Sequence, residues 1–146
     1  MATFTKAEKF VEDLANSVHD LFGTQHTLNV YLTNAAFTAA SHSVKADVAE
    51  ISTGNGYTGP IDTQNDGTRS GGTVTVTGVS TRVTATGAVG PFRRVILYND
   101  TPTSPADPII GGWDYGSEVT LANGETLDIK FNNADVAAAG TILTIA

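Results

Sequence analysis

The residues best placed to bind a metal ion lie between positions 62 and 73. Asp62, Gln64, Asp66 and Gly67 occupy the first, third, fifth and sixth positions of an EF-hand-like calcium loop. The twelfth position needs a bidentate Glu but is Thr73, and no flanking helices are expected. Asp and Asn side chains also bond to their own backbone in Asx turns. We therefore interpret the stretch as a turn-rich loop and predict no metal and no other cofactor.

The imidazoles of the chain are His19, His26 and His42. Histidine-dependent catalysis requires a positioned nucleophile and an orienting group, and the sequence has no G-x-S-x-G elbow and no Cys. The glycine-rich stretches also lack a P-loop Lys and the G-x-G-x-x-G spacing. We predict no catalytic residues and no enzyme activity, and we place His19 at the polar edge of a helix.

The only Trp stands in the sequence Trp113-Asp114-Tyr115, with Glu118 close behind. Paired carboxylates can hydrolyse glycosides, so Asp114 and Glu118 are considered for that chemistry. On a strand, Trp113 and Tyr115 share one face and Asp114 points to the other. The aromatic pair is interpreted either as a carbohydrate-binding shelf or, preferably, as a Trp packed into the core or an interface.

Eight basic residues against fifteen acidic ones give a net charge of −7. Phosphate backbones are bound mainly by Lys and Arg, so nucleic acid is not expected as a partner. There is neither an apolar N-terminal signal segment nor a run of about 18 apolar residues, which predicts cytoplasmic synthesis and no membrane partner. Residues 99–101 match the glycosylation sequon, but they are not interpreted as a glycosylation site because no secretion signal is found.

The N-terminal segment has the pattern of an amphipathic helix. Thr5 and Glu8 have the spacing of a capping box, which predicts a helix start at Thr5. Apolar residues then recur with helical spacing at Phe10, Leu14, Val18 and Leu21. Gly23 is expected to end the helix. We favour packing of this stripe on the chain's own sheet, and the alternative is an arm that docks on a neighbouring subunit.

Beyond the helix the pattern changes to a period of two. Residues 28–33 alternate apolar and polar side chains, which predicts a strand with one buried face. A brief strand is expected near 48–51. Residues 52–72 are rich in Gly and predict an extended loop that contacts other subunits. Residues 73–85 predict two antiparallel strands or one strand bent at Gly78.

The run at 91–99 is the strongest strand signal, because both of its faces are apolar. A strand with two apolar faces is expected at the centre of a sheet. Residues 108–116 are expected to pair with it. Asn123-Gly124 predicts a type I′ hairpin between the segments EVTL and ETLDIKF. Residues 141–145 form the expected closing strand.

The charged fraction of 16% and the 15 Gly residues favour short strands joined by turns. The predicted fold class is mainly β: an antiparallel β-sandwich or barrel with a single N-terminal amphipathic α-helix. We treat 1–146 as one domain, with residues 1–23 as an N-terminal arm or helix and 24–146 as the sandwich, including the extended loop 52–72.

Three segments carry a resemblance to a known group of proteins. They are KFVEDLANSVHDLFGTQHTLNVYLTN, GNGYTG, and GPFRRVILYNDTPTSPADPIIGGWDYGSEVTLANGET, of which LYNDTP…WDYG is the most specific. The chain resembles small virion structural proteins of tailed bacteriophages, of the head decoration or cement kind. This resemblance implies a non-enzymatic protein on the outer capsid surface. Its implied partners are the major capsid protein and further copies of itself, with a trimer expected.

A second function stays open, in which the chain is a tail- or fibre-associated module that contacts host glycans through Tyr57, Trp113 and Tyr115. Pro-stiffened loops bind at low ordering cost, which favours an assembly surface over a reaction centre. The candidate interface residues, drawn from the N-terminal segment, the loop 52–72 and the segment 95–116, are Phe4, Phe10, Tyr57, Pro60, Pro102, Pro105, Trp113 and Tyr115.

Overall fold

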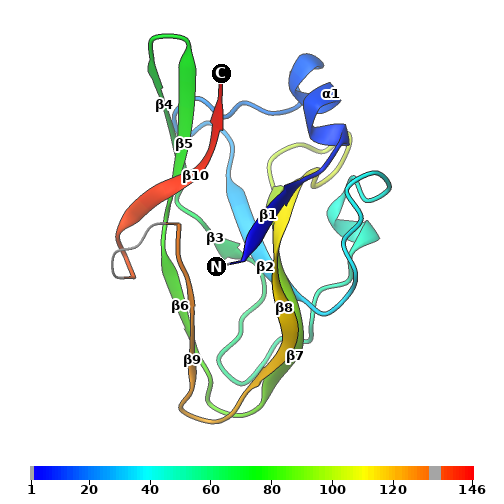
Figure 1. Ribbon diagram of the computed structural model, residues 1–146, viewed down its shortest axis with the longest axis vertical. Coiled ribbons are helices and arrows are strands. Elements are labelled where there is room, and N and C mark those ends of the chain that lie inside the picture. The colour runs from blue at the N-terminus through cyan, green and yellow to red at the C-terminus, as the bar shows by residue number, and fades with distance from the viewer. Residues whose placement is uncertain (1, 132–135) are drawn as a thin grey trace.

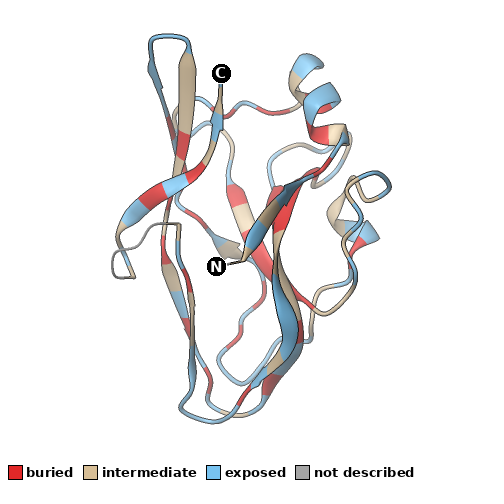
Figure 2. Ribbon diagram, viewed as in Figure 1, coloured by how far each residue is buried: buried red, intermediate tan, exposed pale blue. Residues whose placement is uncertain are grey.

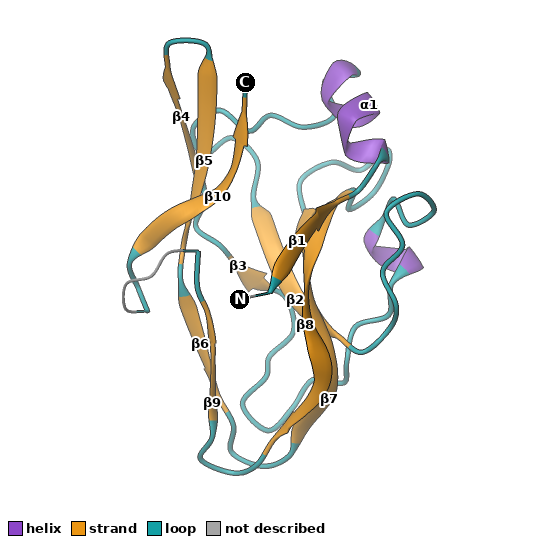
Figure 3. Cartoon of the chain, viewed as in Figure 1, coloured by secondary structure: helices purple, strands orange, loops and turns teal. Residues whose placement is uncertain are grey.

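The computed structural model describes residues 2–131 and 136–146. Its described part consists mainly of antiparallel strands and contains one α-helix, which confirms the predicted fold class (Figures 1 and 3). The elements are β1 (Thr3–Lys6), α1 (Lys9–Ala15), β2 (Leu28–Thr33), a 3₁₀ turn (Lys45–Asp47), β3 (Ile61–Asp62), β4 (Asp66–Ser70), β5 (Thr73–Val79), β6 (Thr81–Thr84), β7 (Val89–Asn99), β8 (Ile109–Leu121), β9 (Thr126–Ile129) and β10 (Ala139–Ile145).

Strand β7 occupies the centre of a five-stranded sheet. The strand order is β1-β8-β7-β2-β3, and every neighbouring pair is antiparallel. Leu97 of β7 lies opposite both Gly111 of β8 and Val30 of β2. The predicted central strand and its predicted partner are therefore confirmed.

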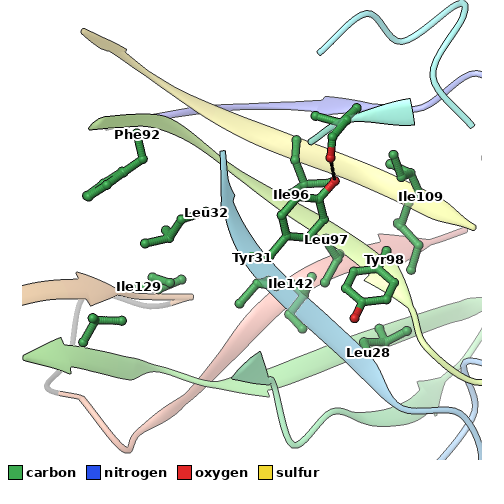
Figure 4. Close-up of a cluster of buried hydrophobic side chains, with 14 of the residues drawn as sticks. Leu28, Tyr31, Leu32, Phe92, Ile96, Leu97, Tyr98, Ile109, Ile129 and Ile142 are labelled. Carbon is green, nitrogen blue, oxygen red and sulfur yellow. Dashed lines mark hydrogen bonds between the residues drawn. The ribbon is translucent and has the colours of Figure 1, made fainter. Parts of the chain in front are cut away.

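Two smaller sheets, β10-β5-β4 and β6-β9, form a second layer beside the large sheet (Figure 1). Buried side chains from both layers meet between them: Leu28, Leu32 and Leu97 from the large sheet, Ile129 and Ile142 from the small ones (Figure 4). Figure 2 shows buried positions along β2, β7 and β8. Removal of this apolar surface from water holds the sandwich-like layers together.

The other face of the large sheet is covered by residues 34–51. The Tyr31 hydroxyl donates to the carbonyl of Val48 at 2.8 Å, and the Thr33 hydroxyl donates to the carbonyl of Ala49 at 2.5 Å. Tyr31 and Thr33 are completely buried. The prediction of only one buried face for residues 28–33 was wrong, because the long connection after β2 folds back over it.

The N-terminal segment begins with a strand and not with the predicted helix. Residues Thr3–Lys6 form β1, in which Thr5 lies opposite Gly112 of β8. The predicted helix start at Thr5 was wrong because strand pairing holds its backbone extended. The helix also ends before the predicted Gly23, since Ser17 adopts a left-handed conformation with a φ of 59°.

The short helix α1 packs on its own sheet. Phe10 is 4% exposed and Ala7 is completely buried in the core. Packing on the chain's own sheet was the favoured interpretation of this segment, and the structure agrees with it. Val11 of the helix and Phe22, beyond its end, are exposed at 53% and 57%.

Residues 48–72 contain more strand than the sequence indicated, and the strands lie at other positions than the predicted one. The brief strand expected at 48–51 is not present, although the Ile51 N–H donates to the carbonyl of Leu32 at 3.0 Å. The stretch 52–72, predicted as an extended loop, includes β3 and β4.

Residues 73–85 follow neither predicted arrangement. Strands β5 and β6 belong to different sheets and do not pair with each other. The break falls at Ser80, not at Gly78, and the Ser80 N–H donates to the carbonyl of Ala138 at 3.0 Å. The chain changes sheet at this point because β5 finds its partners in β4 and β10, whereas β6 pairs with β9.

The turn at Asn123-Gly124 is not a β-hairpin. Gly124 has a φ of 87°, but Asn123 does not have the positive φ that a type I′ turn requires. The Gly124 N–H donates to the carbonyl of Ala85 at 2.7 Å. The turn therefore carries the chain from β8 in the large sheet to β9 in a small one.

Candidate functional site

An apolar groove opens between the two layers, where β1 and α1 face β10. Its volume is about 310 Å³. It is bounded by two strands at sheet edges, β1 on one side and β10 on the other. Two of the predicted interface residues, Phe4 and Phe10, lie in its wall. The full lining is Phe4, Lys6, Phe10, Ile110, Ile142, Leu143 and Thr144.

Trp113 extends this apolar surface as part of an aromatic cluster. Its ring lies 4.9 Å from the ring of Phe4 and 5.9 Å from that of Phe131, measured between centroids. Gly111 makes the approach of β1 possible, because a Cβ there would lie 2.6 Å from the Phe4 ring. Trp113 is half-buried. The structure thus agrees with a packed Trp and not with an exposed aromatic shelf.

The loop 100–108 between β7 and β8 is tied to its surroundings by hydrogen bonds. The Thr27 N–H donates to the Thr101 hydroxyl oxygen at 2.9 Å, and the Lys45 N–H donates to the carbonyl of Asp107 at 2.9 Å. Within the loop, the Asp107 N–H donates to the carbonyl of Pro102 at 3.3 Å. Pro102 and Pro105 are half-buried. The loop therefore presents a fixed surface.

The remaining predicted interface residues are not brought together. Tyr57 is 1% exposed, its hydroxyl donates to Glu50 Oε1 at 2.6 Å, and it accepts from the Leu32 N–H at 3.1 Å. Tyr57 is therefore a core residue of this chain, and Phe10, at 4% exposed, is buried in the wall of the groove. Pro60 is exposed, and Tyr115 is 67% exposed. Because Tyr57 is buried, Tyr57, Trp113 and Tyr115 do not share one exposed surface.

Asp114 lies in an ion-pair cluster and not in a carboxylate pair. Its Oδ1 accepts from Arg93 Nε at 2.8 Å, and its Oδ2 lies 3.1 Å from Arg94 Nε. The hydrogen bond from Arg93 holds the pKa of Asp114 below its usual range, so the group does not serve as a proton donor near neutral pH. Glu118 instead accepts from Asn34 Nδ2 at 2.8 Å.

A polar cluster at the end of β7 was not expected from the sequence. Asn99 is completely buried, and its Nδ2 lies 3.0 Å from His19 Nδ1 and 2.9 Å from His26 Nδ1. The Asp20 N–H also donates to His26 Nδ1, and the Thr101 N–H donates to Asn99 Oδ1. Asn99 Nδ2 is therefore the donor to both rings, and both Nδ1 atoms are acceptors.

His19 is buried in this cluster, which corrects its predicted place at the polar edge of a helix. It is 7% exposed, and its ring lies 5.0 Å from that of Phe10. Burial lowers the pKa of His19 to about 4, His26 adds to the effect, and Asp13 opposes it. The cluster fastens residues 17–27 to the end of β7. No sequence signal indicated it, because Asn99 lies 80 and 73 residues from the two histidines.

The stretch considered for calcium contains the predicted Asx chemistry. The Gln64 N–H donates to Asp62 Oδ1 at 2.7 Å, so this carboxylate bonds to its own backbone. Within residues 2–131 and 136–146, no three His, Asp or Glu side chains gather closely enough to hold a metal ion.

No helix in the described part of the chain combines the length and hydropathy that a membrane crossing needs. Comparisons with protein-family models, curated proteins and solved structures found no match to this chain.

Proposed function

We propose that this chain is a non-enzymatic virion structural protein, a capsid decoration or cement protein that binds the outer surface of the major capsid lattice. The proposal rests on the resemblance of residues 10–131 to small virion proteins of tailed bacteriophages. It also rests on the kind of surface that the fold presents.

The observation that carries the proposal is the fixation of loop 100–108. Backbone and side-chain hydrogen bonds tie this loop to residues 27 and 45 on either side. A loop held in this way loses little conformational entropy when a partner binds it. Such preorganisation suits a protein that occupies many equivalent lattice positions, where weak contacts add through avidity.

The electrostatics are consistent with the outer surface of a capsid. The chain carries a net charge of −7, whereas a surface facing packaged nucleic acid favours basic groups. Arg93 and Arg94 are both bonded to Asp114 and do not form a free basic patch. Two of the titratable groups that the sequence analysis considered for chemistry, Asp114 and His19, are engaged in structural contacts.

Tyr115 is the exposed anchor that we assign to the capsid contact. It follows the packed Trp113 on β8 and is 67% exposed, the largest exposure among the big apolar side chains of the described residues. Exposed aromatic residues at interfaces commonly supply a large share of the binding free energy. Tyr115 therefore tests the proposal without disturbing the core.

The test is co-sedimentation of the purified chain with capsids assembled without it. Tyr115→Ala is expected to weaken binding about tenfold or more, which is the effect of losing one aromatic anchor. Phe22→Ala is the matched control, because Phe22 is also an exposed aromatic residue, at 57%, outside the segment 95–116. Failure of the wild-type chain to bind capsids, or equal binding by wild type and Tyr115→Ala, would contradict the assignment.

A further inference from the structure

Lys6 faces the apolar groove although its side chain is charged. Side chains alternate between the two faces of a strand, so Phe4 and Lys6 of β1 share one face, and both line the groove. The rest of the lining is Phe10, Ile110, Ile142, Leu143 and Thr144. Lys6 is therefore the only charged residue among the described residues that line the groove, and the walls are otherwise mostly apolar.

The ammonium group of Lys6 has no ion-pair partner within residues 2–131 and 136–146. The ion pairs of this part of the chain involve other cations, namely Lys9 with Glu12 and Asp13, Lys45 with Glu50, Arg82 with Asp128, and Arg93 and Arg94 with Asp114. Lys6 is also exposed. In a chain with a net charge of −7, this side chain is thus a cation that is available to an anion from outside the chain.

The opposite wall of the groove offers one polar side chain, the hydroxyl of Thr144. Lys6 is the last residue of β1, and Thr144 is the last but one of β10. Both strands run toward the end of the molecule that carries α1 (Figure 1). The ammonium of Lys6 and the hydroxyl of Thr144 therefore lie toward the same end of the groove. A carboxylate at that end can accept hydrogen bonds from both groups.

The size and lining of the groove fit a small amphiphile better than a peptide. Its volume of about 310 Å³ lies near the lower end of the range for ligand pockets, roughly 300–1,000 Å³, and such pockets are also mainly apolar with a few polar groups. A peptide brings a backbone N–H and C=O with nearly every residue, and each of these groups needs a partner when it is buried. The side chains of the lining supply only two such partners, whereas an unbranched acyl chain needs none.

We propose that the groove binds an unbranched medium-chain fatty acid, with its carboxylate against Lys6 and its acyl chain along Phe4, Phe10 and Leu143. Charge complementarity selects the anionic head group, and removal of apolar surface from water supplies most of the affinity. This site goes beyond the capsid proposal and does not depend on it. The purified chain is sufficient to test it, so its failure is distinguishable from failure of the capsid proposal.

Isothermal titration calorimetry of the purified chain with decanoate, below the critical micelle concentration, measures the binding. Saturable binding to a single site is expected. From hexanoate through octanoate to decanoate, the affinity should rise by up to about fourfold for each CH₂ that enters the groove. Decyltrimethylammonium has the same chain length but a cationic head group, and it should bind about tenfold more weakly than decanoate. Absence of saturable decanoate binding, or equal affinity for the two head groups, would overturn the proposal.

Substitutions in the two parts of the groove locate the ligand. Lys6→Gln removes the cation and is expected to weaken decanoate binding about fivefold, the upper end of what an exposed ion pair contributes, without changing the binding of the neutral octan-1-ol. Lys130→Gln, at another exposed Lys outside the lining, is the matched control and should leave both ligands unaffected. Equal effects of the two Gln variants on decanoate would contradict the contact with Lys6.

The apolar wall is tested at Leu143, which is half-buried. Leu143→Gln places an amide against the acyl chain and is expected to weaken decanoate and octan-1-ol alike, by about tenfold. Leu127→Gln is the matched control, because Leu127 is also half-buried but lies in β9 and outside the lining. Unchanged binding by Leu143→Gln would place the acyl chain elsewhere and contradict the proposal.

The same variants separate ligand binding from a protective role of Lys6. Charged residues on edge strands commonly prevent pairing with another chain, and β1 is an edge strand. If protection is the only role of Lys6, the wild-type chain does not bind decanoate, and Lys6→Gln self-associates in light scattering coupled to size exclusion. That combination of results would overturn the proposal.

Discussion

Acidification should destabilise the fold through His19, by an amount that the buried cluster determines. Burial lowers the pKa of this ring in the folded chain from 6.5 to about 4. The unfolded chain therefore binds the proton more tightly than the folded chain does. Stability from this group is complete above the unfolded pKa of 6.5 and is lost as the pH falls toward 4. The shift corresponds to at most about 3 kcal/mol, at about 1.4 kcal/mol per pKa unit.

The cluster adds a geometric reason for this loss. His19 Nδ1 accepts from Asn99 Nδ2, so a proton on Nδ1 would face another donor. His19→Asn replaces Nδ1 by an amide oxygen that still accepts from Asn99 but does not take up a proton near pH 4. The variant is expected to be less stable at neutral pH, because it loses the ring packing on Phe10, and to lose less stability on acidification.

Urea unfolding monitored by the fluorescence of Trp113, the only Trp, measures the difference. Between neutral pH and about pH 4, wild type should lose about 3 kcal/mol more than His19→Asn. His42→Asn serves as the control, since it also removes an imidazole but leaves the buried cluster intact. Parallel stability curves for wild type and His19→Asn would refute the reasoning.

Two substitutions probe close packing elsewhere. Gly67→Ala would drive a Cβ into the carbonyl of Leu21 and should cost about 2–4 kcal/mol in urea unfolding, whereas Gly72→Ala, with open space around it, should be nearly neutral; equal costs would contradict the contact. Tyr57→Phe leaves the Leu32 N–H without its buried acceptor and should cost about 1–3 kcal/mol by thermal or urea unfolding, with an unchanged stability contradicting the assigned hydrogen bond.

The large sheet was predictable because its information is local. Residues 91–99 are apolar on both faces, and a strand with two apolar faces needs a cover on each side. The structure supplies these covers from the small sheets and from residues 34–51. The alternation at 28–33 predicted the strand but not the burial of Tyr31, because the covering segment has no pattern of its own.

The errors occur where distant partners decide the structure. The spacing of Thr5 and Glu8 satisfies a capping box, but residues Thr3–Lys6 pair instead with β8, more than 100 residues away. The turn at Asn123-Gly124 has the residues of a hairpin, yet β9 pairs with β6 instead of β8. Local turn chemistry was thus present, and tertiary pairing overrode it.

The candidate site, like the fold, could be predicted only in part from the sequence. The sequence predicted Phe4 and Trp113 as candidate interface residues, and the structure places their rings against each other within the chain. It did not indicate the groove, because Ile142 and Leu143 reach Phe4 only through the packing of two sheets. The cluster around Asn99 was missed for the same reason, since its two histidines lie in an irregular segment far from β7 in sequence.

The proposed role on the capsid surface is tested most directly by cryo-electron microscopy of phage particles purified from cells that produce this chain. The account predicts density for the chain repeated over the outer face of the capsid lattice, with Tyr115 and loop 100–108 toward the major capsid protein. Density confined to the tail, density on the inner face of the shell, or absence of the chain from purified particles would contradict it.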